Sequence, residues 1–310
     1  MAVAAKSVRR RARPDHRRRT IPAATDIDRG GGLTVISHAS VTEAHRFAQT
    51  RASITWRVNA ERIVLLGWAR AILLQLAHPL VAAGVFDHSG FRGTPYAAAS
   101  RLYHTVHAML SLTFGDDVAR QRTLDTIRGI HRRVNGVLPE STGCYPPGTR
   151  YSAEDPDLVL WVHATLIESV LLVYEQLVAP LTTAERDEYC AEAYPIAVAL
   201  AAREDEVPRT WSDLLAYLER MYSSQAIAVG AQGRKLASAV LSPSGGWLVA
   251  PATWINRTIT IGLLPSQVRE QYGMTWTARH ERTVTRLVSA LRLTRRVLPD
   301  AIALWPDARR

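Results

Sequence analysis

The sequence predicts an all-α protein with one large helical domain, and two kinds of observation support this prediction. Helix-start signals recur, because Ser40, Ser152, Thr182 and Thr210 are each followed three residues later by Glu or Asp, as in a capping box. Strand signals are scarce, since β-branched runs are short and RTITIG at 257–262 is the main exception. No internal repeat divides the chain.

Apolar periodicity between loops rich in glycine and proline places the helices. Pro156, directly after Asp155, suits the first position of a helix, and Gly136 suits a helix end. We predict a helical domain over residues 35–310 behind an arm and linker over residues 1–34. The expected helices are 40–52, 58–84, 94–114, 116–135, 155–179, 183–202, 210–241 with a break, 247–264 and 276–297.

The composition is that of a folded protein with a basic arm. Hydrophobic residues make up 47% of the 310 residues and charged residues 21%, which excludes an intrinsically disordered chain. The net charge of +10 is concentrated in residues 1–20, which hold eight basic residues and one aspartate. We interpret this block as a disordered, solvated arm rather than a contact for nucleic acid or an anionic membrane, and do not expect nucleic acid as a partner. A nucleic-acid binder that depends on this arm is the alternative.

Several features favour a cytoplasmic protein. Cys144 and Cys190 lie far apart without a C-x-x-C motif, so neither a zinc site nor a disulfide framework is indicated. No apolar stretch follows the basic arm, unlike a secretory or twin-arginine signal. Residues 63–86 contain no acidic residue, but Arg70 within them is costly in a bilayer, so we expect a buried helix and no transmembrane segment.

Polar side chains on apolar helices are the candidate functional residues. His78 interrupts the run LLQLAHPLVAAGV at 73–85, and a buried imidazole needs a partner for each ring nitrogen. Asp87 lies in the turn FDHSGF that follows. Arg101, His104 and Thr105 share one helical stripe, although such a stripe is also typical of a solvated face.

Two further histidines extend this group. His131 falls on the apolar stripe of Leu124, Ile127 and Val134, where a lone histidine is more often a core residue than a ligand. His163 and Thr165 lie in a segment without any charge between Asp157 and Glu168. Together these histidines indicate a helical domain that holds a metal or a cofactor.

Missing motifs narrow the choice of cofactor. The sequence contains no Glu-x-x-His pair for a di-iron centre, no H-E-x-x-H for zinc, and no G-x-G-x-x-G or Walker loop. Heme needs a single histidine from the protein, because the porphyrin supplies four nitrogens. Heme is therefore the cofactor that we predict.

Several motifs also resemble a known family. LLQLAHPLVAAGVFDHSGF, RLYHT, IHRRVNG and YSAEDPDLVLWVHATL, in that order, resemble the oxygenase family that includes the latex-clearing rubber oxygenases and the MpaB oxygenase of the mycophenolate pathway. The resemblance covers roughly residues 50–240. It implies an all-α domain that encloses a pocket for heme b.

The resemblance also implies roles for individual residues. His131 corresponds to the proximal heme ligand, and Arg101 and Thr105 match an R-x-x-x-T motif that surrounds the heme. Rubber oxygenases have a distal lysine before this threonine, whereas this chain has His104, which we interpret as a candidate distal ligand. Asp87 is the candidate for the family's distal carboxylate base.

We therefore predict a heme b monooxygenase or dioxygenase that acts with O2 on a small hydrophobic substrate, such as an alkene or isoprenoid. The electron donor is not identified by the sequence. His163 and Thr165 would contribute to the heme pocket, and His78 would support it or, as the second choice, bind the iron. The alternative is a non-catalytic heme-binding or regulatory protein of the same fold.

Overall fold

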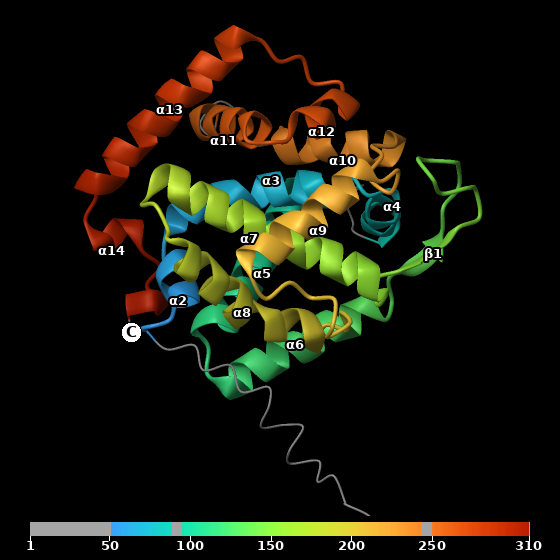
Figure 1. The fold of residues 1–310 in the computed structure, drawn as a ribbon, viewed down its shortest axis with the longest axis horizontal. Helices are drawn as coiled ribbons and strands as arrows, with labels where there is room; N and C mark the ends of the chain where they lie inside the picture. The colour runs from blue at the N-terminus through green and yellow to red at the C-terminus, as the bar shows by residue number, and fades with distance from the viewer. Residues whose placement is uncertain (1–50, 89–94, 243–249, 310) are drawn as a thin grey trace, which may run out of the picture. The chain divides into compact units, whose positions relative to one another are not determined.

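Two apolar helices, α3 and α7, lie side by side at the centre of the fold (Figure 1). The computed structural model describes residues 51–88, 95–242 and 250–309, with side chains in the second range from Tyr103 onward. These residues belong to one compact unit. Helices make up most of it, so the all-α prediction is confirmed. The predicted arm and linker lie outside the described residues, as does the predicted helix at 40–52 except for residues 51 and 52, which form a turn.

The N-terminal elements form a bent path rather than one helix. Helix α2 (Ile54–Asn59) and the 3-10 turn η1 (Arg62–Val64) lead into α3 (Leu65–Leu76), and α4 (Pro79–His88) follows. The segment Arg62–Leu76 and α4 meet at an angle of 106°. The prediction of one helix over 58–84 was therefore wrong, because proline disfavours helical geometry in the residue before it.

A small hairpin replaces the end that we predicted for the fourth helix. Helix α5 (Pro95–Phe114) is followed by α6 (Asp117–His131), which begins at the N-cap Asp116. The chain then forms β1 (Asn135–Val137), which pairs antiparallel with β2 (Arg150–Ser152). Gly136 is thus a strand residue and not a helix cap. A Cβ there would lie 2.4 Å from the hydroxyl oxygen of Tyr151, which explains the glycine.

Two of the predicted helix caps on the following elements are confirmed, and one is wrong. Thr182 and Glu185 form the expected capping box at the start of α8 (Thr183–Ala199), and Thr210 caps α9 (Trp211–Ser223). The predicted box at Ser152 is wrong, since Asp155 caps α7 (Pro156–Leu177). Its carboxylate accepts a hydrogen bond from the Asp157 amide, and Pro156 occupies the first turn as expected.

The C-terminal elements complete the domain. The predicted 210–241 segment breaks into α9 and α10 (Ala231–Leu241), and α11 (Ala250–Gly262) includes the RTITIG run as helix. Helix α13 (Ala278–Val297) matches the last predicted helix. Three short elements were not predicted. They are α12 (Ser266–Gln271), α14 (Asp300–Ala303) and η3 (Asp307–Arg309).

Close contact between α3 and α7 forms the centre of the core. A Cβ on Gly67 would lie 2.6 Å from the backbone oxygen of Ser169, so only glycine allows the helices to approach this closely. Nearer the end of α3, the Gln75 amide donates to the carbonyl of Val162. Later residues of α3 therefore meet earlier residues of α7, and the two helices run antiparallel.

An ion pair crosses the same interface. The Arg70 guanidinium donates to both carboxylate oxygens of Glu168, while its Nη1 reaches Ser169 Oγ at 2.6 Å and its Nε reaches the Leu263 carbonyl at 2.6 Å. The two side chains are only 4% and 14% exposed. Removing one partner of a buried pair costs about 3–5 kcal/mol, so Arg70 and Glu168 fix the register of the two helices.

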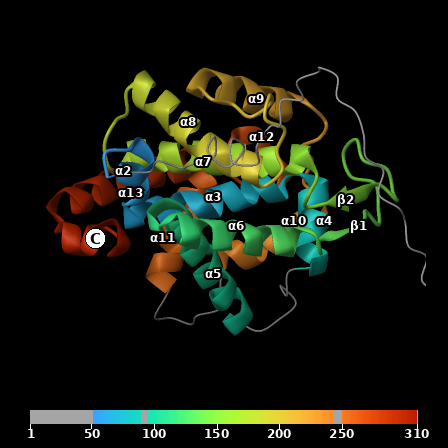
Figure 2. The same ribbon diagram turned by 90° about the horizontal axis from the view of Figure 1, so that it is seen from below.

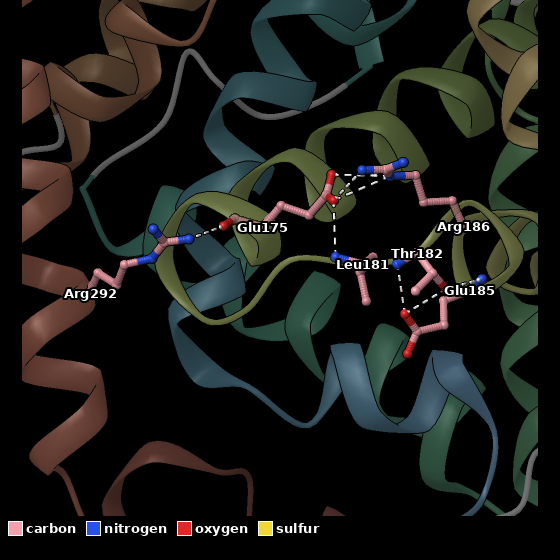
Figure 3. A network of polar contacts seen from close by, with 6 residues as sticks. All are labelled: Glu175, Leu181, Thr182, Glu185, Arg186 and Arg292. Atoms are coloured by element: carbon pink, nitrogen blue, oxygen red, sulfur yellow. Dashed lines mark hydrogen bonds and ion pairs between the residues drawn. The ribbon is translucent and has the colours of Figure 1, made fainter.

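A polar network joins α7 to α8 and α13 (Figure 3). The Glu175 carboxylate accepts from the Leu181 amide at 3.1 Å and from Arg186 Nη2 at 2.6 Å, and its backbone carbonyl accepts from Arg292 Nη2 at 2.8 Å. The network fixes the turn that follows α7 and attaches α13 to it.

One helix in the described part of the chain has the length and hydropathy of a membrane span. It is α7, and 67% of its apolar window is buried inside the protein. Burial of this kind is typical of the core helix of a soluble protein. The bent pair formed by residues 62–76 and α4 passes the same test only when its two helices are counted together.

We predict that Gly67→Ala destabilises the protein by about 1–3 kcal/mol, because the added methyl group would overlap the α7 backbone. Urea unfolding monitored by circular dichroism measures this change. Gly129→Ala is the matched control, since a Cβ there meets only the end of Arg132 at 3.7 Å and alanine favours a helix. Equal stabilities for the two variants would contradict the tight contact at Gly67.

Candidate functional site

His78 lies at the break between α3 and α4, where its side chain is 3% exposed. Its Nδ1 accepts a hydrogen bond from the Leu80 amide at 3.3 Å, and its Nε2 lies 3.1 Å from the Tyr145 hydroxyl. Because Nδ1 is an acceptor, the proton of the neutral ring sits on Nε2, which donates to Tyr145. Burial lowers the pKa of His78 to about 4.

The environment of His78 explains why a histidine occupies an apolar run. Tyr145 belongs to the long turn of the hairpin, and the neighbouring Cys144 amide donates to the carbonyl of Gln225. The Ala228 amide in turn donates to the carbonyl of Ala77 at 3.0 Å. Through these contacts the imidazole joins the start of α4 to two surface loops. Both ring nitrogens are occupied by protein groups, so His78 here has a structural role.

His131 is the last residue of α6 and is half-buried. Among the described residues, no hydrogen-bond partner is found for its ring. Desolvation lowers the pKa of His131, and the negative charge of Glu154 opposes this effect. The end of α6 lies near α4, because a Cβ on Gly84 would be 3.2 Å from Val134. The lowered pKa favours the neutral ring, and no described residue bonds to its nitrogens.

His163 presents a second unused nitrogen. It lies on the central helix α7, and its Nε2 is shielded from solvent without a partner in the described part of the chain. Burial lowers the pKa of His163 to about 4, so the ring is neutral. The Nε1 of Trp161, two residues earlier, is buried and unpartnered in the same way. Orphaned polar atoms of this kind are costly in a core and indicate a missing partner.

Thr165 differs from its neighbour. Its hydroxyl donates to the carbonyl of Trp161 at 2.8 Å, one turn earlier on α7, and the side chain is fully buried. This bond within the helix satisfies the hydroxyl as a donor. Thr165 therefore needs no ligand to remain buried.

Asp87 is attached to the hairpin. The Tyr151 hydroxyl donates to its Oδ2 at 2.6 Å, and His88 Nε2 donates to the Asn135 carbonyl at 2.9 Å. Burial and the neighbouring carboxylate raise the pKa of Tyr151, which keeps the phenol protonated as a donor. The end of α4 is thus joined to both strands. Asp87 itself is exposed, and Tyr151 occupies one of its two carboxylate oxygens.

The stripe on α5 lies in a different environment. His104 and Thr105 are exposed, and the His104 ring makes an edge contact with Tyr103 at a centroid distance of 5.6 Å. The backbone of Arg101 is helical, but its side chain is among those not described. Figure 2 shows α5 extending outward past α6. The end of α5 is anchored by Phe114, whose ring packs edge-on against Trp56 at 4.7 Å.

Sequence reasoning missed three residues that organise this region. Arg70 and Glu168 pair across the core, and Tyr145 satisfies His78. A signal for the pair was present, because α3 and the middle of α7 each carry a single charged residue of opposite sign within an apolar segment. Tyr145 had no such signal, because it lies far from His78 in the sequence and only the fold brings the two residues into contact.

The described side chains offer no ready-made metal cage. Within them, no group of three or more His, Cys, Asp or Glu side chains could hold a metal ion. A metal bound by these residues would therefore need additional ligands. The two imidazoles with unused nitrogens, His131 and His163, are the donors that suit a metal carried by a prosthetic group.

By its fold, this protein is of the all-α class. Its domain is built around an apolar central helix, and neutral histidines lie on its helices. Its family follows from comparison with known proteins. Residues 56–293 match the family described as ER-bound oxygenase mpaB/B'/Rubber oxygenase, catalytic domain. The chain belongs to this family, and the resemblance seen in its motifs is confirmed. An oxygenase is therefore the general class of activity.

Two mycobacterial relatives extend the comparison. Uncharacterized proteins of Mycobacterium bovis and Mycobacterium tuberculosis are each 28% identical to the chain over 235 residues. The matched region is 74% of this chain and 88% of each relative. No solved structure matches the chain.

We predict that the two hydrogen bonds of His78 can be separated by substitution. His78→Asn places an oxygen where Nδ1 accepts from Leu80 and should keep the helix cap, whereas His78→Ala removes both bonds. We expect Ala to cost about 2–4 kcal/mol and Asn about half as much. Unfolding by urea measures both changes. Equal losses would show that the bond to Leu80 has no effect.

We predict that acid destabilises the cofactor-free protein between pH 6.5 and about 4, the window set by His78 and His163. The unfolded state takes up protons at these imidazoles at a higher pH than the folded state does. The free energy of unfolding therefore decreases as the pH is lowered through this window. The limit is about 3 kcal/mol for each histidine. Urea titrations from pH 7 to pH 4 should show a weaker pH dependence for His163→Phe, with exposed His107→Phe as the control.

Proposed function

We propose that this chain is a heme b-dependent oxygenase that acts with O2 on a small apolar substrate. The observation that carries this proposal is a pair of histidines with lowered pKa on helices of an oxygenase catalytic domain: His163, whose buried Nε2 has no partner among the described residues, and His131, for which no hydrogen bond to a described residue is found. A neutral imidazole is the form that binds iron, and burial favours it at both positions.

The donor set of the described residues fits a heme better than a bare ion. Each histidine offers one nitrogen, and the structure provides no group of three protein ligands among the residues that it describes. Heme requires only one or two protein ligands, since four come from the porphyrin. When bound, heme supplies the site at which O2 binds and is activated.

We assign the proximal position to His131. Its ring would donate the lone pair of one nitrogen, and Glu154 favours some positive charge on the imidazole because its carboxylate acts on the same ring. His163, on the central helix, would form a hydrogen bond through its shielded Nε2 with an acceptor or donor group of the bound molecule. Satisfying that nitrogen would remove the cost of leaving it unpartnered.

The α5 residues would add further polar contacts to the site. Arg101 carries a fork of donors that suits the heme propionates, and His104 and Thr105 would add polar contacts near bound O2. Because His104 and Thr105 are exposed, α5 would have to lie closer to α6 and α7 in the loaded protein. Asp87, held by the Tyr151 hydroxyl at one carboxylate oxygen, would be the candidate base.

The apolar surroundings of α7 support a hydrophobic substrate. Leu160, Trp161 and Ala164, which precede and follow His163, are at most 3% exposed. Side chains of this kind exclude water and bind alkene or isoprenoid groups without hydrogen bonds. We place the reaction in the cytoplasm, with an electron donor that the described surfaces do not identify.

We predict that His131→Ala lowers the heme content of the purified protein at least tenfold, whereas His78→Ala retains most of it. Absorption spectra of the oxidised, dithionite-reduced and carbon monoxide-treated protein measure heme content and an accessible sixth position. Circular dichroism controls for folding. The assignment is falsified if His78→Ala loses heme and His131→Ala keeps it.

A different result would distinguish a non-catalytic protein of the same fold from an oxygenase. It would bind heme without consuming O2 in the presence of a reductant and apolar alkenes. A preparation that contains no heme after expression with a heme precursor, and that does not bind added hemin, would contradict the cofactor proposal itself.

A further inference from the structure

Helix α13 presents an outer face that nothing else in the described structure covers. At 100° per residue, nine of its residues fall within an arc of about 120°, and all of them are exposed. They are Ala278, Arg279, Arg282, Arg286, Ser289, Ala290, Leu293, Arg296 and Val297. We call these residues the outer face of α13. Figure 1 shows the helix along the edge of the fold.

The inner face of α13 fixes the helix in place. Val284 is buried, and its side chain approaches Gly262 of α11 so closely that a Cβ there would lie 2.5 Å away. Arg292 donates to the Glu175 carbonyl (Figure 3), and Arg295 donates to both oxygens of the buried Glu61 carboxylate at 2.6 Å. The inward arginines Arg292 and Arg295 are therefore bonded to other parts of the fold, and the outer face is left exposed to solvent.

The arginines of the outer face carry uncompensated charge. No described acidic side chain forms an ion pair with Arg279, Arg282, Arg286 or Arg296, whereas Arg295 on the inner face pairs with Glu61 and Asp300. The row from Arg279 to Arg296 is about 25 Å long at 1.5 Å per residue. It is an extended positive strip, and not a point site for one small anion.

Apolar side chains lie at the end of the same strip. Leu293 is 62% exposed and Val297 is 73% exposed, and Ile302 on α14, five residues further on, is 57% exposed. Leu293 and Val297, on the same helix face as unpaired arginines, form an apolar surface that water solvates poorly, and Ile302 adds an exposed aliphatic side chain just beyond the helix. The partner must therefore offer negative charge along the strip and an apolar phase at its end.

We propose that the outer face of α13 binds the surface of a lipid bilayer that contains anionic lipids. Arginines would contact the headgroups, while Leu293, Val297 and Ile302 would enter the boundary of the acyl chains. A nucleic acid would satisfy the arginines but leave these aliphatic side chains in water. A protein interface of this size is typically anchored by tryptophan or tyrosine, and the outer face contains neither.

Vesicle co-sedimentation of the full-length chain tests this proposal. The probes are vesicles of phosphatidylcholine alone and of equal parts phosphatidylcholine and phosphatidylglycerol. We expect binding to the anionic vesicles only, weakened by salt because the contact is electrostatic. Substituting Arg279, Arg282 and Arg286 by Gln should lower the partition coefficient roughly a hundredfold, since each arginine near such a surface contributes about a factor of five.

Two controls distinguish this face from other basic regions. Replacing Arg122, Arg150 and Arg220 by Gln removes the same charge from exposed positions on α6, β2 and α9, and should change partitioning much less. A full-length variant with the seven arginines of residues 1–20 changed to Gln keeps α13 but removes the charge of the arm. When the α13 substitutions are added to this variant, they should still lower the partition coefficient.

The aliphatic part of the outer face requires its own variant. Leu293→Ser with Val297→Ser should weaken binding at least tenfold in high salt, where the arginines are screened. Circular dichroism of each variant confirms folding. Equal losses for the α13 and control arginines, binding that depends on the arm alone, or a preference for duplex DNA over anionic vesicles would each overturn the proposal. None of these readouts depends on heme.

Discussion

The close antiparallel contact between α3 and α7 is the constraint on which the rest of the structure depends. Gly67 lets the two backbones approach, and the buried pair of Arg70 with Glu168 fixes their register. Once that register is set, the end of α3 and the start of α7 have determined positions. His78 follows α3 directly, and His163 lies in the first half of α7, so the core contact also places these two imidazoles.

Buried histidines serve two different purposes in this fold. His78 has a protein partner for each ring nitrogen, and it joins the start of α4 to the loop that carries Tyr145. His163 is also neutral, but its Nε2, on the central helix, has no partner among the residues that the structure describes. The difference separates a residue that the fold itself requires from one that a bound molecule would satisfy. His131, half-buried and without a hydrogen-bond partner among the described residues, belongs with His163 in this respect.

The two faces of α13 show a similar division. Its inward arginines bond to the Glu175 carbonyl and the Glu61 carboxylate, and so connect the last long helix to α7 and to the start of the fold. Its outward arginines pair with no described acidic group. A substrate that is itself apolar dissolves in membranes, so an oxygenase held at a bilayer surface would meet it at a high local concentration.

The sequence by itself determined the helical class, most helix ranges and the family, because apolar periodicity, capping residues and ordered motifs are local features. It also determined which histidines lie on apolar segments. Only the tertiary structure decided the hairpin around Gly136 and the role of His78, since these depend on Tyr151 and Tyr145, far away in the sequence. The exposure of His104 was decided in the same way, because a helical stripe shows which residues share a face and not what that face contacts.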